Sequence, residues 1–470
     1  MILEIAKHEL RRQFRDGRSI TLLIIMTIIL IAAILLSYGD YKLVKHQYQE
    51  NLEQARFNWE SQTEKDPHDA AHDGTYVIKP MYSLAMLDRG IQQYSGQVVH
   101  LGAHERKQSN ISAAKDMTGM FRFGQMTPNF VLQYLFPLLL IFLGYNAFTE
   151  EKERQTIRLL FAQGTSVRKL ALGKWLALTT QMILLSLLFI LFVAISFMIL
   201  KNEKAVTLIE YLAFFGAYFV YFLIFINLIL LISAKAKTSG ISLTVSLALW
   251  IFITLIVPKL STNMAGKWHS FPSLQTFVEN VNSDRQSGLN GHNFWNEAAQ
   301  DFKKKVLEEY SVETIEELPI SYGGLLLAEG EKYESEIYTK HFNLLRNQYD
   351  KQRNTYRSFG TLSPFLSVKF VSMALARSDY SFQWNFEDQA EKYRVTFNTA
   401  LNMNIAENAK GVEGYKAGSE LWESIPQFNY QWQTTKDILT DHIIEYLILI
   451  AWVVVSFGVM LLAVSKIKIV

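Results

Sequence analysis

The chain has 470 residues, of which 50% are hydrophobic and 19% are charged, and its formal net charge is +2. The hydrophobic residues are gathered in blocks of about 20 residues, the length that a helix needs to cross a bilayer, which argues against a soluble globular enzyme. No cysteine is present, and this excludes disulfides, thiol catalysis and cysteine-based metal sites.

Six apolar blocks predict an all-α membrane protein with six transmembrane helices. The blocks are residues 20–38, 130–148, 170–200, 208–233, 240–257 and 443–464. Their charged residues are Lys174, Glu210 and Glu445, each near a helix end, where a long side chain can reach polar surroundings. The lack of a charge at mid-membrane argues against an ion-driven transporter.

Basic residues predict the orientation of the chain. They are concentrated before the first block, between the second and third, between the fourth and fifth, and after the sixth. By the positive-inside rule these segments, including both termini, lie in the cytoplasm. Segments 39–129 and 258–442 are then extracytoplasmic, and the expected location is the cytoplasmic (inner) membrane, with a cytoplasmic tail at 465–470.

The N-terminal segment, 1–19, has an apolar side that includes Ile5 and Leu10, which predicts an amphipathic helix on the inner membrane surface. Helical spacing over 44–59 predicts that the first span continues outward as a stalk, which Pro67 ends. The remainder to residue 129 is expected to form loops and short helices, with a brief strand at 78–81.

Residues 149–169 join the second and third spans. They mix charges with an apolar stripe at Ile157, Leu160 and Phe161, which predicts an amphipathic helix in the membrane interface. Gly164 is expected to end this helix. A helix held between two spans is well placed to pass a push from a soluble partner into the membrane, although it can also be a plain connector.

The order Phe-Thr-Glu-Glu-Lys-Glu-Arg-Gln-Thr-Ile-Arg-Leu-Leu, then Gly-Thr-Ser-Val-Arg-Lys-Leu and Leu-Gly-Lys, over 148–174 resembles the first cytoplasmic loop of ABC-2-type transporter permeases. In that family the segment is the coupling helix that docks on the ATP-binding cassette subunit, and an elbow helix often precedes the first span. Gln155 stands where the family often has glycine. The resemblance implies an ATPase-coupling role for Glu150, Glu151, Glu153, Arg154, Arg158, Gly164, Thr165 and Arg168.

Segment 258–442 is predicted to be mainly helical, at 292–310, 325–359, 364–377 and 388–409. Its motif residues are Ser363, Pro364, Ser372, Asp379, Glu391 and Arg394. The motif resembles the signature of a branch of ABC-2 permeases with a large extracytoplasmic domain between spans five and six, whose membrane part is similar to gliding-motility and nitrous-oxide-reductase-maturation permeases.

The motif residues also have ordinary structural interpretations, which we favour over substrate contact. Ser363 with Pro364 is typical of a helix start, and Asp379 is expected to cap the next helix. Glu391 and Arg394 are spaced for an ion pair between neighbouring helical turns.

Four polar residues lie within the spans, namely Gln133, Asn146, Gln181 and Asn227. Such side chains more often join neighbouring helices by hydrogen bonds than line a substrate path, and both interpretations stay open. In addition, Pro137 predicts a kink in span two, and Pro258 is expected to end span five.

Two pairs of histidines are each spaced by four residues, namely His68 with His72 and His100 with His104. On a helix such imidazoles point the same way and can share a zinc or copper ion. Asp69 occupies the position of the glutamate in HExxH, so its carboxylate is one methylene short for a metalloprotease. The alternative is a solvated polar loop.

The chain lacks the GxxxxGK[ST] motif, so ATP hydrolysis by a P-loop is not expected in it. No enzyme activity and no cofactor are predicted; ATP and Mg belong to a partner. The predicted function is the permease subunit of an ATP-driven ABC-2-type transporter, by resemblance an exporter, coupled through 149–169 to a separate ATP-binding cassette ATPase.

Further partners follow from this prediction. Six spans are half of the pathway of the resembled family, which implies a second permease copy or a related permease. Membrane lipid and an extracytoplasmic protein are also expected partners. Nucleic acid is not, because the topology places the basic and aromatic patches on the extracytoplasmic side of the membrane.

Two alternatives to transport stay open. One is a mechanotransmission or scaffolding protein that drives an extracytoplasmic partner while nothing crosses the bilayer. The other, based on the paired histidines, is a metal-processing or metalloprotein-maturation assembly. A cavity lined by Gln133, Asn146 or Asn227 favours transport, whereas a sealed interface favours scaffolding.

Overall fold

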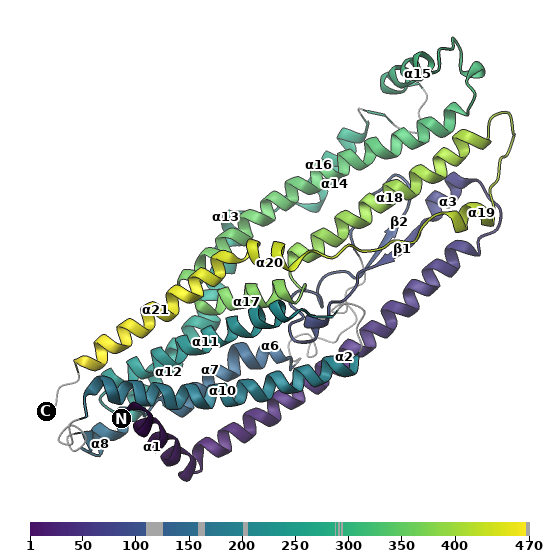
Figure 1. The fold of residues 1–470 in the computed structure, drawn as a ribbon. Helices are drawn as coiled ribbons and strands as arrows, with labels where there is room; N and C mark the ends of the chain where they lie inside the picture. Colours follow the sequence, from purple (N-terminus) through teal and green to yellow (C-terminus); the bar gives the residue numbers. More distant parts are fainter. Residues whose placement is uncertain are drawn as a thin grey trace.

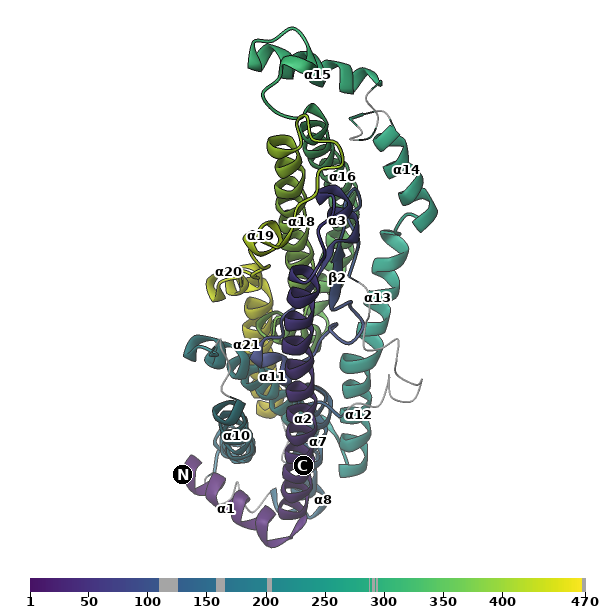
Figure 2. The ribbon, with the colours of Figure 1, turned by 90° about the vertical axis from the view of Figure 1, so that its right-hand side faces the viewer.

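The computed structural model describes residues 1–109, 126–157, 165–200, 205–286, 288–289, 292 and 295–466. The molecule is elongated and mostly helical (Figure 1). Helix α1 (Ile2–Arg15) and the last turns of α21 (Ile443–Ser465) lie at the same end, which we call the base. The helices that extend beyond the spans form a projecting part, and α15 (Glu297–Tyr310) lies at its far end (Figure 2).

Among the described residues, six helical segments are long and apolar enough to cross a membrane. They are Arg18–Glu60 (α2), Pro128–Glu153, Val167–Leu200 (α10), Leu208–Lys235 (α11), Ser239–Trp268 and Ile443–Ser465 (α21). They include all six predicted blocks. Large apolar side chains such as Leu184, Leu187 and Ile199 are exposed on them, as expected where a helix faces lipid rather than water.

The first span and its stalk form one helix of 43 residues, α2, as the spacing predicts. Gly17 separates it from α1 by adopting a φ of 72°, a conformation that suits glycine. Pro67 does not end the stalk, so this prediction is wrong. The helix ends at Glu60, and Pro67 instead begins α3 (Pro67–Asp73), since the first helical turn tolerates proline.

A two-stranded antiparallel sheet follows α3. Its strands are β1 (Thr75–Ile78) and β2 (Val98–Leu101), with Thr75 opposite Leu101. The strand predicted at 78–81 is therefore misplaced, because β1 shares only Ile78 with it and residues 79–81 are not in a strand. The 3₁₀ turn η1 (Ser83–Met86) lies between the two strands in sequence.

Spans two and five each contain a π-helical turn. Their elements are α6 (Pro128–Phe130), η2 (Val131–Leu135) and α7 (Phe136–Gly144), then α12 (Ser239–Ile251), η3 (Phe252–Ile256) and α13 (Val257–Trp268). A proline follows each π-turn, Pro137 in α7 and Pro258 in α13. The expectation that Pro258 ends span five is wrong, because the helix continues to Trp268 beyond a π-turn that accommodates the proline.

The remaining helices lie between spans five and six. They are α14 (Leu274–Gln286), α15, η4 (Ile315–Glu317), α16 (Tyr322–Ser358), η5 (Phe359–Thr361), α17 (Pro364–Leu375), α18 (Tyr380–Asn408), α19 (Ser419–Ser424) and α20 (Thr435–Asp441). The four predicted helices correspond to α15, α16, α17 and α18. Helix α16 packs along α18 (Figure 1).

Helix α17 packs within the spans rather than in the projecting part. Its side chains Phe365, Val368 and Val371 share one hydrophobic core with residues of α11 and α21. Residues 258–442 are therefore not a unit separate from the spans. A helix of 12 residues is too short to be recognised as a span from sequence.

The charged residues near the span ends reach polar surroundings, as expected, but these surroundings are charged groups inside the protein rather than solvent. All three are buried. Their ion pairs are Lys174 with Glu9 and Glu151, Glu210 with Arg377, and Glu445 with Arg357. A buried charge requires such a partner, and here each partner lies in another part of the chain.

Lys79 follows β1 and is also buried. Its Nζ donates to Ser95 Oγ at 2.8 Å and to Gln383 Oε1. Burial lowers the pKa of Lys79 to about 7, although the charge of Glu387 opposes the shift. Because the unfolded lysine has a pKa near 10.5, the unfolded state binds more protons between these two values, and stability rises with pH over that interval.

Lys79→Met is therefore expected to stabilise the protein at pH 7 and to remove the part of the pH dependence that lies between pH 7 and 9. Thermal unfolding at both pH values measures this. Lys392→Met, at an exposed position of α18, is the matched control and should keep the change of melting temperature between pH 7 and 9 that the native chain shows. If the melting temperature of the Lys79 variant changes with pH as much as that of the native chain, the prediction is wrong.

Candidate functional site

The predicted coupling segment begins with α8 (Thr149–Glu153), which follows span two at the base (Figure 1). The single helix predicted over 149–169 is interrupted, because α8 ends at Glu153. Arg158 and Gly164 lie outside the described residues. The chain is described again from Thr165, and α10 begins at Val167.

Gln155, two residues after the end of α8, adopts a φ of 58°. This left-handed conformation costs a residue other than glycine about 1 kcal/mol. The position is the one at which the resembled permeases often have glycine. The backbone geometry thus supplies a physical reason for glycine there, and Gln155 carries the strain in this chain.

Glu151 of α8 points into the protein, where one ammonium lies between two carboxylates. Lys174 Nζ of α10 is 2.6 Å from Glu151 Oε1 and 2.7 Å from Glu9 Oε1 of α1. All three side chains are buried. This ionic triad joins α8 to α1 and to span three.

A second set of contacts joins α8 to span five. Glu153 Oε1 accepts a hydrogen bond from Ser239 N at 2.7 Å, and Oε2 accepts one from Ser239 Oγ at 2.8 Å. Ser239 begins α12, so this carboxylate caps a helix N-terminus. Lys152 Nζ donates to the carbonyl oxygen of Ala236 at 3.0 Å, in the turn before α12. A displacement of α8 therefore acts on two spans at once.

The predicted coupling residues divide by charge. The acidic ones make intramolecular contacts; Glu150, for example, is 3.3 Å from Arg12. Arg154 has a 70% exposed side chain whose ion pair is to Glu150 at 3.0 Å, and Arg168 is exposed. These two are accessible to a partner. Sequence reasoning missed the triad, although a lysine inside an apolar block was a signal for it.

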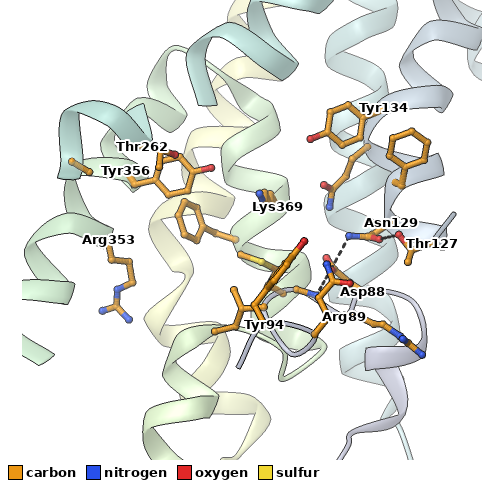
Figure 3. A pocket seen from close by; sticks show the side chains of 18 of the residues that line it. Asp88, Arg89, Tyr94, Thr127, Asn129, Tyr134, Thr262, Arg353, Tyr356 and Lys369 are labelled. Carbon is orange, nitrogen blue, oxygen red and sulfur yellow. Dashed lines mark hydrogen bonds between the residues drawn. The ribbon is translucent and has the colours of Figure 1, made fainter. Parts of the chain in front are cut away.

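Among the polar residues of the spans, Gln133 lines a cavity of about 540 Å³ (Figure 3). The cavity lies between span two, α13, α16, α17 and the segment 88–94 after η1. Its cationic side chains are Arg89, Arg353 and Lys369, and its aromatic rings include Tyr134. Gln133 also donates from Nε2 to the hydroxyl of Tyr218 at 2.9 Å.

The other three polar residues join helices, which confirms the structural interpretation for them. Their hydrogen bonds are Trp175 Nε1 to Asn227 Oδ1 at 2.9 Å, Asn227 Nδ2 to Ser456 Oγ at 3.0 Å, Gln181 Nε2 to Gln13 Oε1, and Arg18 Nη2 to Asn146 Oδ1 at 3.1 Å. None of the three lines this cavity.

The motif residues mostly take the structural roles predicted for them. Asp379 Oδ1 accepts from Phe382 N at 3.0 Å and caps α18, which is confirmed. Ser363 and Pro364 begin α17 as predicted. The hydroxyl of Ser363, however, donates to the carbonyl oxygen of Ile253 in η3 at 2.7 Å, and it thereby ties α17 to the π-turn of span five.

Ser372 and the pair Glu391–Arg394 hold more distant elements. Ser372 Oγ contacts the hydroxyl of Tyr218 at 2.9 Å and donates to Asp88. The ion pair predicted between Glu391 and Arg394 is confirmed at 2.9 Å. The contact of Ser372 with Tyr218 links α17 to α11. The ion pair joins two neighbouring turns of α18.

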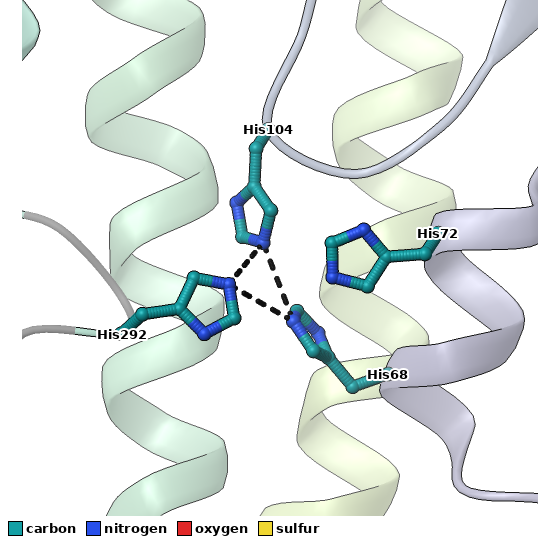
Figure 4. Close-up of side chains that lie close together, drawn as sticks. All are labelled: His68, His72, His104 and His292. Atoms are coloured by element: carbon teal, nitrogen blue, oxygen red, sulfur yellow. Dashed lines mark hydrogen bonds between the residues drawn. The ribbon is translucent and has the colours of Figure 1, made fainter.

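Four histidines from three segments lie together in the projecting part (Figure 4). They are His68 and His72 of α3, His104 in the turn after β2, and His292 between α14 and α15; we call them the histidine cluster. Their ligand atoms all lie within 4.8 Å of one another. The Nε2 separations are 3.3 Å for His68 to His104, 3.4 Å for His68 to His292, and 2.8 Å for His104 to His292.

Three of the four predicted histidines are thus brought together, and His100 is not. Its Nε2 bonds the backbone oxygen of Asp73 at 2.9 Å, beside the ring of Tyr76. His292 takes its place in the group. No spacing pattern connects His292 with the others, because it is 188 residues from His104.

Buried polar side chains hold two of the rings. His104 Nδ1 lies 3.0 Å from Glu331 and 3.2 Å from Glu334 on α16, and His68 Nδ1 lies 2.9 Å from Asn402 Oδ1 on α18. Burial opposes a charge on His104, but the two carboxylates outweigh it and raise its pKa to about 9. Burial lowers the pKa of His68 to about 4.

Arg394 connects the motif to this cluster. Its Nη1 lies 2.8 Å from Glu331 Oε2, and both side chains are fully buried. Burial raises the pKa of Glu331, but His104 and Arg394 outweigh it and lower the value to about 2. The pair Glu391–Arg394 therefore supports the carboxylate that orients His104.

Residues 276–431 match a family described as a domain of unknown function, DUF3526. The match covers about a third of the chain, from α14 to the segment before α20, and includes His292 and Glu331 but not the other three histidines. The comparison with curated proteins gave no match.

Proposed function

We propose that the chain is the membrane-spanning subunit of an ATP-driven ABC-2-type exporter in the cytoplasmic membrane, moved through α8 by a separate ATP-binding cassette ATPase. The observation that carries this proposal is the double attachment of α8. Glu151 connects it to α10 and α1 through Lys174, and Glu153 connects it to α12 through Ser239. In this proposal the base is cytoplasmic and the projecting part extracytoplasmic.

The proposed mechanism begins when ATP binding closes two partner ATPases and displaces α8. Because the contacts of Glu151 and Glu153 are short and ionic or charge-assisted, spans three and five move with the helix. The π-turns η2 and η3 are the places at which spans two and five can change their bend. Ser363 then passes the movement of η3 to α17, which lines the cavity.

Transport is favoured over scaffolding by the cavity itself. Gln133 lines it together with Lys369 of α17 and Tyr134 (Figure 3), at the end of the spans from which the projecting part rises. A device that only drives an outside partner has no need of a polar cavity there. We infer that the cavity is where the transported molecule leaves the spans.

A second copy of the chain, or a related permease, completes the pathway in this proposal. Large apolar side chains are exposed along α2 and along span five, for instance Ile24, Ile28, Val245 and Leu255. Lipid can cover such surfaces, and so can a second permease. Spans one, two and five are expected to rearrange around the path between the two copies.

Arg154→Glu is expected to reduce recovery of the ATPase about tenfold or more when the chain is isolated from its native membrane in mild detergent. The reason is that the exposed guanidinium of Arg154 is available to a partner, and reversing a charge at a charge-paired interface costs several kcal/mol. Mass spectrometry of the co-purified proteins measures the recovery.

Lys7→Glu, on an exposed position of α1, is the matched control and should keep the ATPase bound. Thermal unfolding of both variants should match that of the native chain. If the native chain retains no ATPase under several gentle conditions, or if both variants lose it equally, the proposed coupling through α8 is wrong.

A further inference from the structure

We propose that His68, His72, His104 and His292 bind one divalent transition-metal ion, with Zn²⁺ as the expected ion. Neutral imidazole is a preferred ligand of zinc, and tetrahedral Zn–N bonds of about 2.0–2.1 Å place neighbouring nitrogens about 3.3–3.4 Å apart. The Nε2 separations of 3.3 Å and 3.4 Å around His68 fit this spacing, and the 2.8 Å between His104 and His292 has to widen by about half an ångström when the ion binds. The proposal does not depend on the permease function.

The hydrogen bonds of the rings favour a cation at their centre. In a neutral imidazole one nitrogen carries the proton and the other a lone pair. The Nδ1 atoms of His68 and His104 face the acceptors Asn402 and Glu331 and therefore carry the protons. With His104 neutral, the Nε2 lone pairs of His68 and His104 face each other at 3.3 Å, an arrangement that either a second proton on His104 or a cation between the rings stabilises.

The surroundings are also those of a metal ligand. A histidine that binds a metal ion usually donates its second N–H to a carboxylate or carbonyl oxygen, which fixes the ring and raises its basicity. Glu331 and Glu334 provide this for His104, and Arg394 and Arg285 in turn hold the two carboxylates at 2.8 Å each. The ring of His104 is therefore oriented by buried charges that are themselves held in place by ion pairs.

A solvated polar loop does not explain the arrangement. His68 is 9% exposed, and His104 adopts a φ of 64°, a left-handed conformation that needs support from its surroundings. The imidazoles come from three segments that are distant in sequence. His72 and His292 are exposed, and a cavity of about 980 Å³ reaches His72 and His104, so an ion can arrive from solvent.

One consequence is mechanical. A shared ion ties α3, the turn after β2 and the segment around His292 to one another. It therefore holds His292 against α3 and the turn after β2. Because the ion binds only the folded chain, it is expected to raise the melting temperature of the projecting part.

The test uses the full chain in detergent, purified with a tag that lacks histidine and stripped with a chelator. Titration with zinc sulfate alone is expected to show one ion per chain, and X-ray absorption should show imidazole nitrogens at about 2.0 Å. His72→Ala and His292→Ala remove exposed ligands, so folding should persist, and each should weaken zinc binding at least tenfold. Asn402→Ala should weaken it about tenfold.

His100→Ala is the matched control, because His100 is a nearby histidine outside the cluster. It should leave zinc stoichiometry and affinity unchanged, and calcium should not compete, because it prefers oxygen ligands. The proposal is overturned if the native chain binds no stoichiometric zinc, if His100→Ala lowers affinity as much as His292→Ala, or if neither cluster variant changes it. The metal-free melting temperatures of the variants show whether each is folded.

Discussion

Arg377→Met is expected to lower the free energy of unfolding by about 3–5 kcal/mol, because it leaves a buried carboxylate without its cation. Arg377 Nη2 lies 2.7 Å from Glu210 Oε1, and both side chains are 1% exposed. The guanidinium also lies over the ring of Tyr82, 3.9 Å from its centre. Equilibrium unfolding of the purified chain in mixed micelles measures the loss.

The size of this effect follows from how completely Glu210 is enclosed. Its Oε2 accepts hydrogen bonds from Tyr82 Oη at 2.7 Å and from Thr207 N at 2.8 Å, while Oε1 also accepts one from Thr435 Oγ1 at 2.9 Å. The cluster joins the start of α11 to the turn before α18. It is therefore a joint between the spans and the projecting part.

Two further variants separate the buried charge from general damage. Arg377→Met combined with Glu210→Met should recover part of the lost stability, because neither charge is then left alone. Arg353→Met removes a partly exposed ion pair with Asp350 and should cost less than about 1 kcal/mol. A loss of that small size in Arg377→Met, or no recovery in the double variant, contradicts the argument.

The sequence predicted the features that depend on neighbouring residues. Apolar runs located all six spans, helical spacing over 44–59 predicted the stalk, and local patterns predicted the cap at Asp379 and the pair Glu391–Arg394. Each of these depends on residues within a few turns of one another. Periodicity and capping rules describe that range well.

The features that were missed depend on contacts between distant residues. The partner of Lys174 in α1 is 165 residues away, and the partner of Glu210 is 167 residues away, so no local pattern identifies either. The prediction that histidines four residues apart lie close together is confirmed for His68 and His72, because both lie on α3. It failed for His100 because β2 ends at Leu101 and His104 lies beyond a turn.

The second large effect is expected at the ionic triad of the base. Lys174→Met leaves Glu151 buried without its cation and leaves Glu9 with Arg12 as its remaining partner, which should cost about 3–5 kcal/mol of unfolding free energy. In the proposed mechanism it also disconnects α8 from span three. Thermal unfolding measures the first effect, and a reporter at the cavity measures the second.

The absence of cysteine from the chain makes such a reporter simple to introduce. Thr262→Cys places one thiol on the cavity lining, at an exposed position. In the complex with its ATPase, ATP is expected to change the rate at which this thiol reacts with a maleimide. Lys174→Met should reduce that change to the part that Glu153 and span five transmit, while the ATPase stays bound and active.

A triple variant separates stability from coupling. Lys174→Met with Glu9→Gln and Glu151→Gln leaves no buried charge in the triad, so stability should return to within about 1 kcal/mol of the native chain, yet the response of the thiol to ATP should stay reduced. Lys169→Met, at an exposed position near the start of the same helix, should change neither property. If the triple variant responds to ATP as the native chain does, the triad only stabilises the base, and the movement of α8 reaches the cavity through Glu153 and span five.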